Sequence, residues 1–228
     1  MNRIVSWNCN GGFKKKFESL IQIPADLYLI QEVESNIDWL NIPNFPANNF
    51  IFNVKSAGNY CDKRGVLAFS FSNSKIHSLH RFEDLEMRYY QYFKFKKQRI
   101  LNVWTHGNYI EDLFSLVLLN RAELFKDNKG LIIGDFNSNA IWNRKHIFRN
   151  HSDFNQLLAK YQYYSAYHLL NHVIFGEEQQ FTFRMWRKEE LGYHIDYAYG
   201  PLTCMRSFEI DHCLDQLSDH SVLRLVID

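Results

Sequence analysis

Short apolar runs with strand character recur along the whole chain, and several follow one another with little more than a turn between them. The runs at residues 65–71 and 87–95 combine the aromatic and β-branched side chains that favour strands. This pattern predicts a mixed, largely antiparallel α/β sandwich rather than a purely parallel, doubly wound sheet. The strand-like runs are residues 3–8, 27–31, 65–71, 87–95, 100–105, 131–134, 181–184, 193–199, 206–211 and 221–227.

Helical periodicity occurs in fewer segments. Residues 13–21 and 152–160 predict short helices, and residues 108–125 carry the longest one-sided apolar pattern. Asn108 with Glu111 three residues later has the spacing of a capping box, which places the start of that helix at Asn108.

Composition places the chain among globular proteins. Of its 228 residues, 46% are hydrophobic and 16% aromatic, which excludes a disordered or collagen-like chain. With four prolines, no repeat and no Pro/Gly-rich linker, we expect a single domain over residues 1–228. The 26 Lys and Arg nearly balance the 25 Asp and Glu, so the net charge of +1 argues against a strongly basic coat for nonspecific nucleic-acid binding.

The spacing of the cysteines and the length of the apolar segments indicate the cellular compartment. Cys9, Cys61, Cys204 and Cys213 form no C-x-x-C pair, which makes a structural zinc site an unlikely feature. The first residues lack the apolar core of a secretory signal, and no run approaches the roughly 20 apolar residues of a membrane span. We therefore expect a soluble, reduced, cytoplasmic protein with no membrane partner.

Polar side chains follow several apolar strands at the point where each strand ends. Asn8, Glu32, His106 and Asp135 all occupy such positions. Groups at strand ends are suited to catalysis because rigid strands can aim them. Residues two apart in a strand share a face, so Asp135 and Asn137 point the same way if the backbone stays extended.

Two further polar positions complete the candidate set. Asp196 lies inside an aromatic strand, where an acidic side chain needs a paired histidine or a cation, and Asp219 with His220 precedes the last apolar strand. Oxygen ligands dominate this set, which favours a hard cation such as Mg²⁺ or Mn²⁺ over zinc. Carboxylates, a hard metal and histidines are the groups that phosphate-ester hydrolysis requires. The set is Asn8, Glu32, His106, Asp135, Asn137, Asp196, Asp219 and His220.

Five short motifs in this set resemble, in order, those of the endonuclease/exonuclease/phosphatase superfamily, which includes exonuclease III-like and deoxyribonuclease I-like enzymes. They are SWNCNG at 6–11, IQE at 30–32, GDFNS at 134–138, HIDY at 194–197 and SDH at 218–220. Each motif alone is weak, but together they span nearly the whole chain. The resemblance implies a four-layer α/β/β/α sandwich, with two mixed, mostly antiparallel sheets packed face to face and helices outside.

The resemblance also implies roles on the metal side of the site. Glu32 resembles the principal metal ligand, and Asn8 resembles its neighbour that orients the metal or the phosphate. Asp219 resembles the second carboxylate on the metal side. The implied cofactor is Mg²⁺ or Mn²⁺.

Other implied roles concern the reacting phosphate. Asp135 and Asn137 resemble the pair that handles the attacking water and the scissile phosphate. His220 resembles the histidine that contacts the phosphate or acts as general base, and Asp196 resembles the carboxylate that orients it. His106 resembles the histidine that assists the leaving oxygen.

Several candidate substrate contacts surround these groups. Exonuclease III-like members have a tyrosine at the position of Trp104, whereas deoxyribonuclease-like members end the same strand with a histidine, which selects His106. We favour His106 because tryptophan cannot donate a proton to a leaving group. Trp104, Trp142, Arg184 and Trp186 are the candidate substrate-binding residues.

The favoured function is a metal-dependent phosphodiesterase that acts on nucleic acid, with DNA as the first candidate and a protein partner as one means of selecting the substrate. Two alternatives remain open. A small-molecule or lipid phosphoester fits the nearly neutral charge, since nucleases that follow a phosphate backbone usually concentrate positive charge. A catalytically silent binding protein on the same fold is the second alternative.

Overall fold

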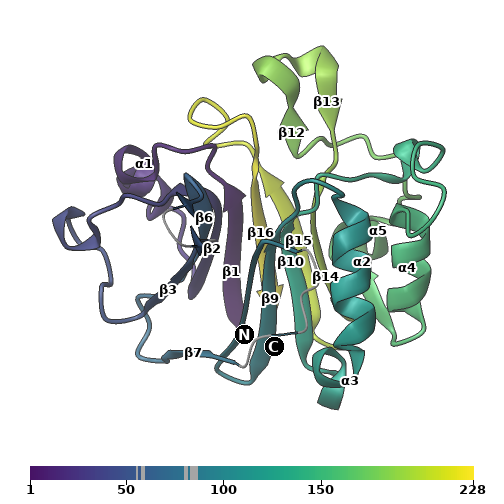
Figure 1. The fold of residues 1–228 in the computed structure, drawn as a ribbon, viewed down its shortest axis with the longest axis horizontal. Coiled ribbons are helices and arrows are strands. Elements are labelled where there is room, and N and C mark those ends of the chain that lie inside the picture. The colour runs from purple at the N-terminus through teal and green to yellow at the C-terminus, as the bar shows by residue number, and fades with distance from the viewer. Residues whose placement is uncertain (55, 58–59, 80–81, 83–86) are drawn as a thin grey trace.

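The computed structural model describes all residues except 55, 58–59, 80–81 and 83–86. Within the described residues, two six-stranded sheets pack face to face (Figure 1). The first sheet has the order β15 (Met205–Asp211), β16 (Val222–Ile227), β1 (Asn2–Asn8), β2 (Leu27–Glu34), β6 (Arg64–Phe69), β3 (Phe50–Asn53). The second has the order β11 (Tyr163–Ser165), β14 (Asp196–Pro201), β10 (Gly130–Asp135), β9 (Gln98–Trp104), β8 (Tyr89–Phe95), β7 (Ile76–Ser78).

Each sheet contains a parallel pair surrounded by antiparallel neighbours. β1 runs parallel to β2, and β9 runs parallel to β10, whereas the other pairs in both sheets are antiparallel. The segments between the parallel strands contain α1 (Phe13–Leu20) in the first sheet and α2 (Ile110–Leu119) with α3 (Arg121–Leu124) in the second. The mixed, mostly antiparallel arrangement expected from the sequence is confirmed.

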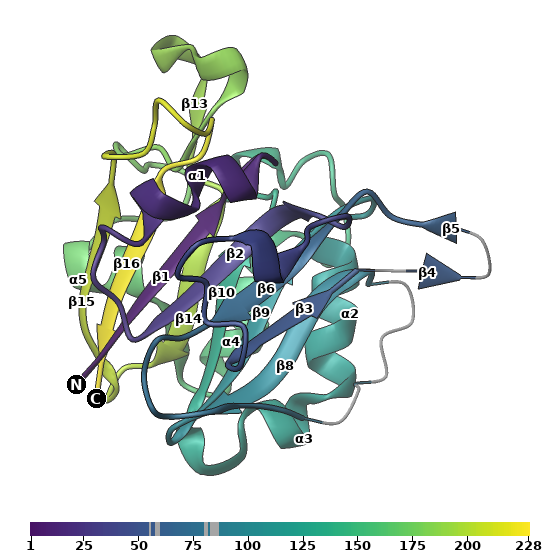
Figure 2. The same cartoon turned by 90° about the vertical axis from the view of Figure 1, so that its left-hand side faces the viewer.

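Alternating side chains along the central strands face two different apolar layers. Ile4 of β1 and Ile133 of β10 lie in the layer between the sheets, where they are buried with Phe93 and Leu225. Their neighbours in sequence point outward, toward α1 on the first sheet and toward the helices on the second. In the described part of the chain the layers therefore follow the order helix, sheet, sheet, helix (Figure 1), which confirms the expected α/β/β/α sandwich. Figure 2 looks onto the first sheet with α1 in front.

The helices differ in part from the sequence predictions. The predicted capping box at Asn108 is wrong. The N-cap of α2 is Tyr109, with a φ of 50°, and the helix begins at Ile110. The Asn108 side chain donates to Asp112 instead. The predicted helix also breaks at Asn120. On the outer face of the second sheet, α4 (His151–Ala159) does start with a capping box, formed by Asn150 and Asp153, and α5 (Ala166–Asn171) follows β11.

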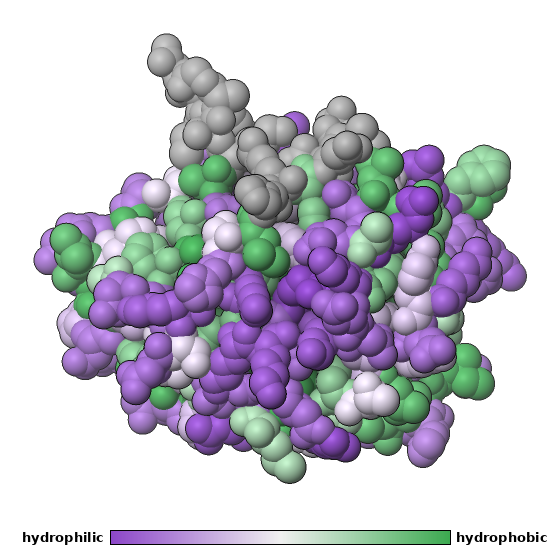
Figure 3. All heavy atoms as spheres, turned by 90° about the horizontal axis from the view of Figure 1, so that it is seen from below, coloured by the Kyte–Doolittle hydropathy of each residue, from purple (hydrophilic) through white to green (hydrophobic). Residues whose placement is uncertain are grey.

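Short elements complete the described chain. A ribbon of β12 (Phe183–Arg184) and β13 (Gly192–Tyr193) projects beyond the sandwich (Figure 1). The opposite face, near both termini, carries hydrophilic side chains across its middle (Figure 3). Among the described residues, no helix has the length and apolarity that a membrane crossing requires. The remaining elements are β4 (Ser56–Ala57), β5 (Tyr60–Cys61), η1 (Trp39–Asn41), η2 (Lys126–Asn128), η3 (Ala140–Trp142), η4 (Met185–Arg187) and η5 (Glu189–Leu191).

Candidate active site

Six of the predicted site residues meet at one edge of the sandwich, and they come from both sheets. Asn8 ends β1, and Asp135 ends β10 on the facing sheet. Asp196 opens β14 directly opposite Asp135. Because β16 is antiparallel to β1, the residues just before β16 return to the same edge. The six are Asn8, Glu32, Asp135, Asp196, Asp219 and His220. Asn137 joins them as a seventh predicted residue through its hydrogen bonds to Asp135.

Asn8 joins two carboxylates across the gap between the sheets. Its Nδ2 donates to Glu32 Oε1 at 2.9 Å and to Asp135 Oδ2 at 2.8 Å. Its Oδ1 accepts the backbone N–H of Asn10 at 3.0 Å, and the residue is fully buried. Every hydrogen-bonding atom of this amide therefore has a partner, which fixes the two carboxylates relative to each other.

Glu32 reaches the site because β2 is irregular there. The register between β2 and β6 shifts between Ile30 and Val33, and Glu32 itself has a left-handed φ of 59°. Its carboxylate is 17% exposed and forms an ion pair with Arg64, the first residue of β6. Glu32 thus faces the solvent-accessible side of the site while remaining anchored to Asn8 and Arg64.

Asp135 is held by the turn that follows β10. Gly134 has a φ of 139°, and a Cβ there would lie 2.1 Å from the Val103 carbonyl, so only glycine allows this approach to β9. The backbone does not stay extended beyond Asp135: Asn137 has a φ of 44° and lies beside Asp135 through an Asx turn instead. Its N–H donates to Asp135 Oδ1 at 2.8 Å, and its Nδ2 donates to Oδ2 at 3.1 Å.

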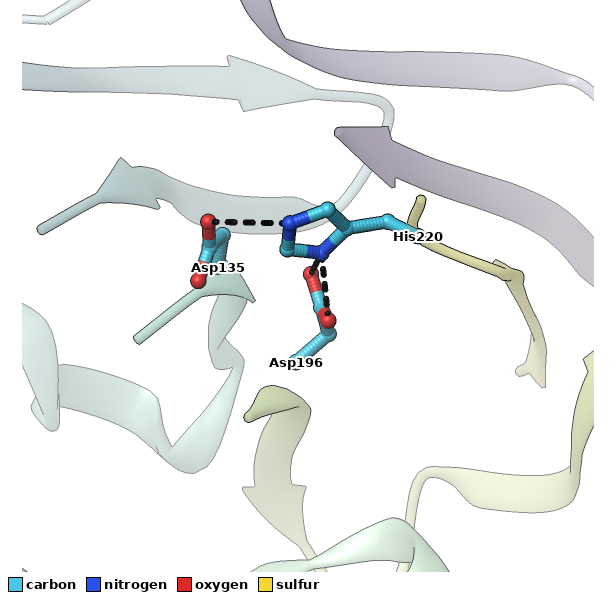
Figure 4. A group of neighbouring side chains, drawn as sticks. All are labelled: Asp135, Asp196 and His220. Carbon is cyan, nitrogen blue, oxygen red and sulfur yellow. Dashed lines mark hydrogen bonds and ion pairs between the residues drawn. The ribbon is translucent and has the colours of Figure 1, made fainter. Parts of the chain in front are cut away.

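Asp196 and His220 form a buried pair, and the His220 ring lies between Asp196 and Asp135 (Figure 4). His220 Nδ1 is 2.9 Å from Asp196 Oδ2, and Nε2 is 3.9 Å from Asp135 Oδ2. Burial by itself lowers the pKa of His220, but the adjacent Asp196 carboxylate outweighs it and raises the pKa to about 10. The imidazole is therefore protonated at neutral pH.

The charge on Asp135 bears on whether this site suits a cation. Burial, followed by the nearby Asp196 carboxylate, raises the pKa of Asp135 to about 8. At neutral pH the Asp135 carboxyl is therefore largely protonated, and a bound cation would favour its ionised form. Ligand atoms of Asp135, Asp196 and His220 lie within 4.8 Å of one another, so this group could hold a metal ion. The many oxygen donors, and the absence of thiolates among them, fit a hard divalent cation.

Asp219 joins the site through a hydrogen bond to Asn10. Its Oδ1 accepts a hydrogen bond from Asn10 Nδ2 at 3.0 Å, and its carboxylate is half-buried. Asn10 Oδ1 in turn accepts from Arg64 at 3.1 Å. Asn10 and Arg64 therefore connect Asp219 to Glu32.

The other predicted residues lie around this centre. His106, just beyond β9, is exposed, with its ring 6.1 Å from that of Trp104 and 6.2 Å from that of Tyr89. Trp104 is only 8% exposed and stacks on Tyr89, so little of its surface is available to a ligand. Among the described residues, His106 has no hydrogen bond or ion pair with the six central residues, although the carbonyl of the adjacent Thr105 accepts from Asn137 Nδ2 at 3.0 Å.

The predicted substrate-binding residues from the later part of the chain differ in the exposure and the contacts of their side chains. Trp142 is half-buried against Tyr193 at 5.1 Å between ring centroids. Arg184 forms an ion pair with Asp215 at 2.9 Å. Trp186 stands on the projecting ribbon and is 74% exposed.

Sequence reasoning missed two residues of the site. Asn10 lies in the SWNCNG motif, which gives it no role of its own, and Arg64 precedes the strand expected at residues 65–71. An arginine before an apolar strand is a common feature of exposed strand ends. Its contact with Glu32 depends on the irregular pairing of β2 with β6, which no local pattern reveals.

The sandwich fold with carboxylates, amides and a histidine at one edge defines the class of protein: an α/β/β/α domain with an acidic, histidine-containing site suited to phosphoester hydrolysis. The sequence model of the Endonuclease/Exonuclease/phosphatase family matches residues 5–220, and the chain belongs to this family. A search of curated proteins found no match.

Solved structures share the fold at low sequence identity. A 3'-5' exonuclease (NExo) from Neisseria meningitidis is 17% identical with a TM-score of 0.72, over 99% of each chain. The catalytic domain of Xenopus laevis APE2 is 14% identical with a TM-score of 0.75, over 99% of this chain and 91% of that one. An AP endonuclease from Archaeoglobus fulgidus is 16% identical with a TM-score of 0.66, over the full length of both chains. Family membership supports phosphoester hydrolysis as the reaction class.

Proposed function

We propose that this protein is a divalent-metal-dependent phosphodiesterase that hydrolyses nucleic acid, with DNA as the favoured substrate. The observation that carries the proposal is that Asn8 joins Glu32 to Asp135 at one edge of the sandwich, where the Asp196–His220 pair lies beside Asp135. These groups can bind a cation, position a water molecule and donate a proton toward phosphate oxygens within one small region.

Glu32 and Asp219 are the proposed metal ligands, with Asn8 as the amide that orients Glu32. Mg²⁺ or Mn²⁺ bound there would neutralise charge on the phosphate oxygens. Both carboxylates keep some exposure, unlike the fully buried Asp135, so they can offer an oxygen to an ion that enters from solvent.

The remaining residues act on the water and the phosphate. His220 is protonated, so it suits donation from Nε2 to a non-bridging phosphate oxygen better than proton abstraction. Asp135 is the proposed base for water, because a bound divalent cation would lower the pKa that burial has raised and so favour the ionised carboxylate. Asn137 would hold the phosphate, and His106 would assist the leaving oxygen from the exposed rim.

Support for DNA comes from the surroundings of the site and from a relative. One structure of NExo, 17% identical, is a 3' phosphatase bound to a product DNA hairpin. Trp186 projects 74% exposed from the ribbon of β12 and β13, and Arg187 and Lys188 beside it are exposed as well. An exposed indole next to cations can stack on a base while the cations contact phosphates. Trp104, Trp142 and Arg184 are further proposed contacts, and a partner protein could add specificity.

The test is nicking of supercoiled plasmid by the purified protein in Mg²⁺, Mn²⁺ or EDTA. We expect nicking that requires the metal and that falls at least about 100-fold in Glu32→Ala, Glu32→Gln and His220→Ala. Glu18→Ala, which removes an exposed carboxylate of α1, is the matched control and should retain full activity. Circular dichroism of each variant checks its fold.

Two results would contradict the proposal. Equal nicking by the wild-type protein and Glu32→Ala would exclude this site as the source of activity. A folded wild-type protein that neither nicks the plasmid nor degrades a linear DNA duplex would exclude the DNA substrate. A panel of small phosphodiesters then tests the one alternative that the near-zero net charge favours, a small-molecule phosphoester.

A further inference from the structure

Arg64 places a permanent positive charge inside the carboxylate cluster. Its Nη1 contacts the Glu32 carboxylate and donates to Asn10 Oδ1 at 3.1 Å. Asn10 in turn donates to Asp219 at 3.0 Å. Both proposed metal ligands are therefore linked to this one guanidinium, directly for Glu32 and through Asn10 for Asp219.

The backbone around the Arg64 guanidinium departs from regular strand geometry and leaves room for this side chain. β2 and β6 shift register just where Glu32 occurs, and the regular pairing resumes with Val33 opposite Gly65 and Glu34 opposite Arg64. Gly11, with a φ of 69°, lies under the guanidinium, and a Cβ there would approach Nη2 to 3.1 Å. The Arg64 side chain is therefore positioned by β2, by β6 and by the loop that contains Gly11.

This position makes Arg64 a competitor for any cation that Glu32 binds. Arginine stays charged at all relevant pH values, so it cannot yield the carboxylate by losing a proton. A divalent ion on Glu32 must either displace the guanidinium or bind against its repulsion. The Arg64 side chain is 39% exposed, so solvent-filled space is available for it to leave Glu32.

We propose that Arg64 neutralises Glu32 until the metal binds, and that the released guanidinium then binds the substrate phosphate. This inference rests on the proposed function. Guanidinium groups bind phosphate oxygens in a bidentate fashion, and this one starts from the edge where the phosphate would lie. Metal and substrate then favour each other's binding, because the metal frees a phosphate ligand and the phosphate removes a competitor of the metal.

The experiment measures Mn²⁺ binding by electron paramagnetic resonance, with and without a phosphorothioate-linked DNA oligonucleotide. In Arg64→Ala we expect Mn²⁺ affinity to rise about five- to tenfold without DNA, and the gain in Mn²⁺ affinity that DNA gives the wild-type protein to disappear. Arg64→Gln, which can keep the hydrogen bond to Asn10, should behave in the same way if Arg64→Ala folds poorly. Lys63→Ala removes a neighbouring exposed charge and should change neither quantity.

The outcomes separate this inference from the proposed function. Unchanged or weaker Mn²⁺ binding in both Arg64 variants would overturn it, and so would a DNA effect that persists in them. If the wild-type protein nicks plasmid while either of these results is found, only the role of Arg64 fails. If the wild-type protein binds no Mn²⁺ at all, the proposed function fails and this inference fails with it.

Discussion

The His220 imidazole lies between two carboxylates, and its two contacts differ in kind. The contact of Nδ1 with Asp196 is a short, buried hydrogen bond of 2.9 Å, whereas Nε2 is 3.9 Å from Asp135. The backbone of Asp196 is also held in place, because its N–H donates to Thr182 Oγ1 at 3.0 Å. Asp196 therefore orients His220 and contributes most to its raised pKa, with smaller contributions from Asp135 and Asp219.

Asp196→Asn tests this dependence because it keeps the size of the side chain and removes its charge. Without the carboxylate, the largest cause that raises the pKa of His220 is lost, and this pKa should fall from about 10 toward its ordinary value of 6.5. We expect a neutral imidazole at pH 7.5 by NMR of the histidine ring, and a loss of roughly 10²- to 10⁴-fold in turnover. A His220 that stays protonated in this variant would show that Asp196 does not hold the proton.

Among the elements, α4 is tied to the site by its first residue. His151 Nδ1 is 3.2 Å from Ser138 Oγ in the turn after β10, and Nε2 is 3.1 Å from the Tyr199 hydroxyl on β14. Burial, followed by the nearby His168, lowers the pKa of His151 to about 3. The ring is therefore neutral in the folded protein, and it links the helix to both strands that carry Asp135 and Asp196.

This neutral histidine makes stability depend on pH. The unfolded chain binds a proton at His151 with a pKa near 6.5, whereas the folded chain does not until about pH 3. The stabilisation is thus complete above pH 6.5 and is lost as the pH falls. Between pH 7 and pH 5 we expect His151 to account for a loss of about 2 kcal/mol in the free energy of unfolding.

The measurement compares urea unfolding at pH 7 and pH 5 in the metal-free wild-type protein and in His151→Gln, which can still hydrogen-bond on both sides. The variant should lose less stability than the wild-type protein by about 2 kcal/mol. The comparison cancels the opposite contribution of Asp135, whose raised pKa favours the folded state as the pH falls toward 5. His77→Gln, on the exposed face of β7, is the control. Equal pH dependence in His151→Gln and the wild-type protein would refute the prediction.

The elements also show how far local sequence patterns reach. The apolar runs at residues 3–8 and 131–134 predicted β1 and β10 closely, because buried strands need continuous apolar side chains. The ends of those runs identified the residues that meet at the site edge. The left-handed backbone at Glu32 was not predictable, since it depends on pairing between distant segments. The same holds for Arg64, which reaches Glu32 only through the irregular register of β2 and β6. The left-handed backbone at Asn137 belongs instead to a local Asx turn with Asp135.

At the scale of the whole molecule, the site depends on both sheets at once. Asn8 and Glu32 belong to the first sheet, and Asp135 and Asp196 belong to the second. The layer between the sheets combines apolar side chains with a polar chain in which Gln31 donates to Asn102 at 2.8 Å and Asn102 donates to Gln91 at 3.1 Å. Because these amides are buried, separation of the sheets would expose polar and apolar partners together, and we expect the chain to unfold as one unit.

Ile133→Ala tests whether the chain unfolds as one unit, because Ile133 lies in the apolar layer between the two sheets. Ile133 is fully buried on β10, and the truncation should cost about 2–5 kcal/mol. In protein labelled with 5-fluorotryptophan, Trp7 reports on the first sheet and Trp104 on the second. A single cooperative domain requires the ¹⁹F signals of both residues to disappear at the same urea concentration, and Ile133→Ala should lower that concentration equally for both. If the variant shifted the Trp104 transition and left the Trp7 transition in place, the two sheets would be separate folding units, and the site between them would form only after both had folded.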